Sequence, residues 1–112
     1  YDSTYGYNDV IGYRNGFCDS FKTTEEIIEV PLTIMDCGLT IYMGLNPKKA
    51  LEKTKSLLEQ VKKQKGIVVI NWHNHYFGSL HPHEKKLYEH ILKSCYKMDA
   101  WMPTISEYIN ER

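Results

Sequence analysis

Apolar residues recur along this chain in two patterns, which separate predicted strands from predicted helices. Compact apolar runs predict strands at residues 10–13, 27–35, 67–70 and 100–102, and the run at 67–70 consists entirely of β-branched residues. Pro31 has no N–H to give to a ladder, so we expect it to split the second run into two pieces. The run at 67–70 is continuously apolar, which is typical of a strand covered on both faces.

Apolar residues at spacings of three and four predict a long amphipathic helix in the middle of the chain. Asn46 and Pro47 form a helix start, with Asn as the N-cap and Pro in the first turn. Gly66 marks its C-terminal end. The apolar stripe between them consists of Ala50, Leu51, Thr54, Leu57, Leu58 and Val61.

Two further helices are predicted after the strand at 67–70. The first follows a loop at residues 76–83 and carries a stripe made of Leu87, Ile91, Cys95 and Met98. The second runs to about Asn110, because Thr104 and Glu107 have the spacing of a capping box. Strands that alternate with helices in this way predict an α/β fold with a largely parallel sheet.

Composition narrows the class of protein without identifying it. The chain has 112 residues, which is one domain or part of one, and its 14 basic and 14 acidic side chains cancel. This balance gives no electrostatic reason to expect a nucleic acid or an anionic membrane as partner. The apolar runs are far shorter than the roughly 20 residues of a membrane span. The start at Tyr1, without a methionine or a signal-peptide pattern, suggests a chain cut from a longer one.

The three cysteines, Cys18, Cys37 and Cys95, are widely spaced. An odd number without a C-x-x-C pair predicts neither a disulfide framework nor a zinc knuckle. We therefore interpret them as free buried thiols.

Arg14, Asp36 and His73 each follow a predicted strand. Because parallel α/β folds gather the carboxyl ends of their strands on one face, these groups are expected to share that face. Each residue could instead have a purely structural role. Arg14 could be a surface arginine in a turn, Asp36 a turn-forming residue, and His73 a histidine packed in the core or a loop. Their common placement favours a functional interpretation.

Histidines and aromatic residues surround the end of the strand at 67–70. His73 and His75 would point the same way on an extended segment, and with His81 and His83 they could form a metal site. Trp72, Tyr76 and Phe77 flank them and could stack on a sugar ring or simply pack.

Three segments together resemble the NodB-like polysaccharide deacetylases. Residues 11–16 (IGYRNG) look like the arginine motif of that family, residues 32–36 (LTIMD) like the region that supplies an aspartate, and residues 68–74 (VVINWHN) like the strand that carries the catalytic histidine. Their order and approximate spacing match over nearly the whole chain.

The resemblance implies a distorted (β/α) barrel that removes acetyl groups from the nitrogen or oxygen of sugars. Such enzymes use a divalent metal, usually zinc, to activate water and polarise the acetyl carbonyl. It further implies that His73 is the general acid, that Asp36 tunes His73, and that Arg14 orients a base aspartate. Trp72 and Tyr13 would line the pocket for the sugar or the acetyl group.

The family's metal ligands are missing, because the chain has no H-x-x-x-H motif and no Asp-Asp pair. About four strands are also only half of a (β/α)8 barrel, which takes about 250 residues. We therefore expect residues 1–112 to be the C-terminal portion of one deacetylase-like domain, inactive alone, with the metal ligands in an N-terminal half. Two alternatives stay open: a non-catalytic α/β module that binds a carbohydrate or a partner, and a small His-rich metal-binding domain.

Overall fold

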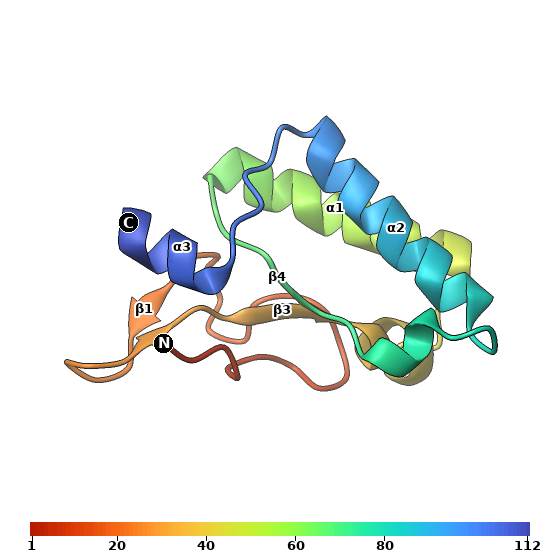
Figure 1. Cartoon of the computed structure of the whole chain (residues 1–112), viewed down its shortest axis with the longest axis horizontal. Helices are drawn as coiled ribbons and strands as arrows, with labels where there is room; N and C mark the ends of the chain where they lie inside the picture. The colour runs from red at the N-terminus through yellow and green to blue at the C-terminus, as the bar shows by residue number, and fades with distance from the viewer.

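The computed structural model describes all 112 residues and shows a mixed α/β architecture. The two long helices lie side by side over β3 and β4, and the N-terminal segment runs along the other side of these strands (Figure 1). The elements in chain order are β1 (Phe21–Lys22), β2 (Ile28–Glu29), β3 (Leu32–Met35), the π-helix η1 (Gly38–Tyr42), α1 (Pro47–Gln64), β4 (Val69–Asn71), the 3-10 helix η2 (Asn74–Phe77), α2 (Pro82–Lys97) and α3 (Ile105–Glu111).

The strands β3 and β4 form a parallel pair, with η1 and α1 in the connection between them. Met35 pairs with Asn71 at the carboxyl end of the pair, so the chain leaves both strands at the same edge. The register shifts between Leu32 and Ile34, where the Val69 N–H donates to the Thr33 hydroxyl at 3.1 Å. This register sets which side chains meet beyond the strand ends.

The core lies between this pair of strands and the two long helices. Each helix presents its predicted apolar stripe to it, because residues three and four apart share one helix face. The buried cluster consists of Ile34, Leu39, Ala50, Leu58, Leu87 and Ile91. Both long helices were therefore predicted correctly, and so was the interruption at Pro31, which separates β2 from β3.

The helix α1 begins as predicted and ends near Gly66 for a different reason. Asn46 caps it by accepting the Lys49 N–H at 2.9 Å. The left-handed residue at its other end is Lys65, with φ of 54°, and not Gly66. At Gly66 the requirement is space, because a Cβ there would lie 2.6 Å from the Cys18 carbonyl oxygen.

The N-terminal segment is fastened to Ile67, just before β4. The Ile67 N–H donates to the Cys18 carbonyl at 2.8 Å, and the Tyr13 hydroxyl donates to the Ile67 carbonyl. Burial raises the pKa of Tyr13 well above its usual value, so this hydroxyl keeps its proton. Both backbone groups of Ile67 are thus held by residues from the N-terminal segment.

Two predicted strands do not form, and one hairpin was not predicted. Residues 10–13 touch β3 through a single backbone bond, from the Gly12 N–H to the Thr33 carbonyl at 2.9 Å. Residues 100–102 lie across an apolar cavity of about 580 Å³ from β4, without a ladder between them. In the antiparallel pair β1–β2, β2 lies within the strand predicted at residues 27–35, whereas no strand was predicted at β1. The chain therefore has one parallel and one antiparallel pair, and the (β/α) barrel stays a prediction.

None of the helices combines the length and the apolar character that crossing a lipid bilayer requires.

Gly66→Ala is expected to lower the free energy of unfolding by about 1–3 kcal/mol, because the new methyl group would overlap the Cys18 backbone. Urea unfolding measures the change. Gly38→Ala is the matched control, since φ there lies outside the left-handed region and the nearest atom is 3.7 Å from the added Cβ, an ordinary contact. A loss in Gly66→Ala no larger than in the control would contradict the close approach.

The capping box of α3 forms as predicted and makes this helix sensitive to acid. The Glu107 carboxylate accepts the backbone N–H and the hydroxyl of Thr104, and these bonds hold the pKa of Glu107 below its usual value. A depressed folded-state pKa stabilises α3 above the unfolded pKa, about 4.3. That stabilisation is lost as the pH falls through the lower folded value.

We therefore expect α3 to fray in acid while α1 and α2 stay formed. An NMR titration of the Thr104 amide measures this directly, and Glu107→Gln should abolish the acid step. An unchanged acid step in Glu107→Gln would assign the transition to another group.

Candidate functional site

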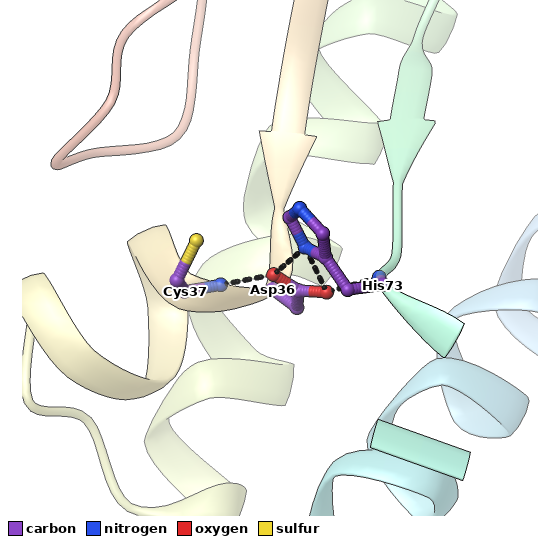
Figure 2. Close-up of side chains that lie close together, drawn as sticks. All are labelled: Asp36, Cys37 and His73. Carbon is purple, nitrogen blue, oxygen red and sulfur yellow. Dashed lines mark hydrogen bonds and ion pairs between the residues drawn. The ribbon is translucent and has the colours of Figure 1, made fainter. Parts of the chain in front are cut away.

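Asp36 and His73 meet where the two parallel strands end. Asp36 directly follows β3, and His73 comes two residues after β4 as the N-cap of η2. Figure 2 shows the imidazole ring over the carboxylate, with one ring nitrogen toward Asp36 and the other pointing away. The sequence-based expectation that these two residues share one face is confirmed by their contact.

The carboxylate of Asp36 is completely buried and fully used as an acceptor. Its two oxygens lie 2.8 and 2.9 Å from Nδ1 of His73. The backbone N–H of His73 donates to one oxygen, and the backbone N–H of Cys37 donates to the other at 2.6 Å. The exposed fraction is 0% for the Asp36 side chain and 45% for the His73 side chain. A buried carboxylate is thereby connected to a ring that reaches solvent.

This geometry fixes which nitrogen of His73 is available for chemistry. A carboxylate only accepts hydrogen bonds, so Nδ1 carries the proton that lies between the two groups. Nε2 is then the free position, and it can accept or donate a proton, or bind a cation. Asp36 holds the tautomer and the ring orientation, as the carboxylate of a catalytic Asp–His pair does.

Cys37 is the third polar group of this site and was not singled out from the sequence. One ligand atom each from Asp36, Cys37 and His73 lie within 4.8 Å of one another. Burial raises the pKa of the Cys37 thiol above its usual value, and the neighbouring Asp36 raises it further. All three cysteines are free as predicted, although only Cys18 is fully buried. The position of Cys37 directly after Asp36 at a strand end was the signal that could have identified it.

The four histidines considered as a metal site do not converge. The ring of His75 is 5.8 Å from that of His73 and 5.9 Å from that of His81, measured between centroids. Asp36, Cys37 and His73 are the one group of three or more His, Cys, Asp and Glu residues whose ligand atoms cluster. His75, His81 and His83 do not belong to this cluster.

Arg14 and Tyr13 lie on the N-terminal segment. The Arg14 guanidinium is exposed and sits 5.0 Å above the ring centroid of Tyr5, and it makes no ion pair. The hydroxyl of Tyr13 bonds Ile67 before β4 begins, whereas His73 follows the other end of that strand. The structure does not bring Tyr13 to the Asp36–His73 pair.

Trp72 and Phe77 pack against the helix α2. Their rings are 5.4 and 5.2 Å from the ring of Tyr88, and Trp72 also touches the core cluster. Tyr76 is buried beside His75, with 4.2 Å between the ring centroids. Consecutive residues of an extended segment alternate in direction, which accounts for Trp72 facing the core while the His73 ring faces solvent. A role for Trp72 in lining a substrate pocket therefore has no support from its position.

Comparison of the chain with protein-family models, with curated proteins and with solved structures gave no match.

Asp36→Ala is expected to lower the free energy of unfolding by about 2–4 kcal/mol, because it removes the buried acceptor of the backbone N–H groups of His73 and Cys37. Asp36→Asn keeps one acceptor oxygen and should lose less. Urea unfolding of both variants measures the difference, with Asp9→Ala, at an exposed position, as the control. Equal stability of the Asp36→Ala and Asp9→Ala variants would show that the hydrogen bonds of the Asp36 carboxylate do not stabilise the fold.

Proposed function

We propose that Asp36 and His73 are the proton-transfer pair of a hydrolase that removes acetyl groups from carbohydrates. In this proposal residues 1–112 are the C-terminal portion of a polysaccharide-deacetylase-like domain. The observation that carries it is the bond between the buried Asp36 carboxylate and Nδ1 of His73. The resemblance of residues 11–16, 32–36 and 68–74 to the motifs of that family supplies the substrate class.

His73 acts through Nε2 in this mechanism. As an imidazolium, the ring gives the Nε2 proton to the amine or alcohol that leaves when the bond to the acetyl carbon breaks. Asp36 supports the positive charge of the ring before the transfer and keeps Nε2 pointed at the leaving group. The exposure of the His73 ring leaves room for a sugar to approach that nitrogen.

The divalent metal of the family does not fit the residues of this chain. Neither an H-x-x-x-H motif nor an Asp-Asp pair occurs, and the only clustered ligand set contains Asp36, which is already committed to His73. The proposal therefore places that metal and its ligands outside residues 1–112. No step described for His73 passes through it.

Arg14 receives a positioning role in the same proposal. The guanidinium would hold the base aspartate that the rest of the domain supplies, since a planar guanidinium binds a carboxylate in a two-pronged contact. Within residues 1–112 it makes no ion pair, so its donors are free for such a partner.

His73→Asn in the intact protein is expected to lower kcat by about 10²–10⁴-fold, the usual contribution of a general acid. Asparagine can still donate to Asp36, so the fold should persist while Nε2 is lost. Acetate release from a panel of N-acetylated and O-acetylated oligosaccharides measures kcat, and urea unfolding checks stability.

The matched control is His75→Asn on the neighbouring turn, which should keep kcat within about twofold. If His73→Asn and His75→Asn slow acetate release equally, His73 is not the acid. If the wild-type protein releases acetate from no member of the panel, the substrate class is wrong.

A further inference from the structure

We propose that Cys37 and His73 form a binding site for a thiophilic divalent cation such as Zn²⁺, with Asp36 holding the His73 ring in place. This site is separate from the metal centre that the deacetylase resemblance implies, whose ligands lie in other motifs. It rests on the geometry of three residues and does not require that the protein be a deacetylase.

The orientation of His73 is that of a metal-binding histidine. Histidines that bind a metal almost always donate the other ring N–H to a carboxylate, a carbonyl or a water. Nδ1 of His73 lies 2.8 and 2.9 Å from the two oxygens of Asp36, so its one N–H is shared between them. Nε2 is thereby fixed in direction and, on a side chain that is 45% exposed, open to an ion from solution.

Cys37 supplies the second ligand and the preference for a soft cation. In Figure 2 its sulfur lies on the same side of Asp36 as the His73 ring. One ligand atom from each of the three residues, either ring nitrogen in the case of His73, lies within 4.8 Å of the other two. A tetrahedral zinc ion holds a thiolate and an imidazole nitrogen about 3.5 Å apart. The proposal requires the Cys37 sulfur to come that close to Nε2, and the Cys37 side chain is partly exposed and so has room to rotate about its Cα–Cβ bond.

The charges of the site also suit such an ion. Binding releases the thiol proton to solvent, so a divalent cation meets one thiolate, one neutral imidazole and, behind the ring, the Asp36 carboxylate. Water completes the coordination on the exposed side. A bound cation also occupies Nε2, so under the proposed function it would block proton transfer. That inhibitory consequence alone rests on the proposed function.

Cobalt replaces zinc in such sites and reports a thiolate ligand through a charge-transfer absorbance. The reduced 112-residue chain is titrated with Co²⁺ and then with Zn²⁺ as a competitor. We expect one Co²⁺ per chain, a charge-transfer band, and displacement of Co²⁺ by Zn²⁺. Cys37→Ser should abolish the band, and His73→Asn, which keeps a donor toward Asp36, should weaken binding at least tenfold. Asp36→Asn should weaken binding about 10–100-fold, the usual effect of losing such a supporting carboxylate.

Cys95→Ser and His75→Ala are the matched controls and should bind like the wild type. A band that survives Cys37→Ser, or losses of the same size in the controls, overturns the site. Because no activity is measured, failure of metal binding leaves the proton-transfer proposal intact. Inactivity on acetylated sugars likewise leaves the metal site intact.

Discussion

The buried carboxylate of Asp36 is the contact on which the rest of this site depends. It collects N–H groups from Cys37 and from both the backbone and the ring of His73, and so ties the chain after β3 to the chain after β4. A buried carboxylate without such partners is costly, so the two strand ends are stable only together. The same contact sets the direction of the His73 ring.

Features that depend on local chemistry were predictable from the sequence. The Asn46–Pro47 start, the interruption at Pro31 and the Thr104–Glu107 capping box all appear as expected, because each is decided by residues within one or two turns. The meeting of Asp36 and His73 was also predictable, since parallel strands that end together bring the following residues together. That inference required only the order of the elements.

Other features that depend on a distant partner were not predictable. Residues 10–13 and 100–102 have strand-like composition, yet a strand exists only where a neighbouring edge receives its hydrogen bonds, and composition does not report that edge. Two residues near the candidate site were also misjudged because their surroundings depend on the fold. Trp72 looked like a pocket wall, but alternation along the chain turns it toward Tyr88, and Cys37 looked inert until the fold placed it beside His73.

Both backbone groups of Ile67 are hydrogen-bonded to the N-terminal segment, so the segment that carries Arg14 and the strand that leads to His73 share one point of attachment. Arg14 immediately follows Tyr13, whose hydroxyl donates to the Ile67 carbonyl. His73 comes two residues after β4, the strand that starts shortly after Ile67. A substitution of Tyr13 would therefore remove one of the bonds that hold the start of β4, the strand that leads to His73, without touching the His73 ring itself.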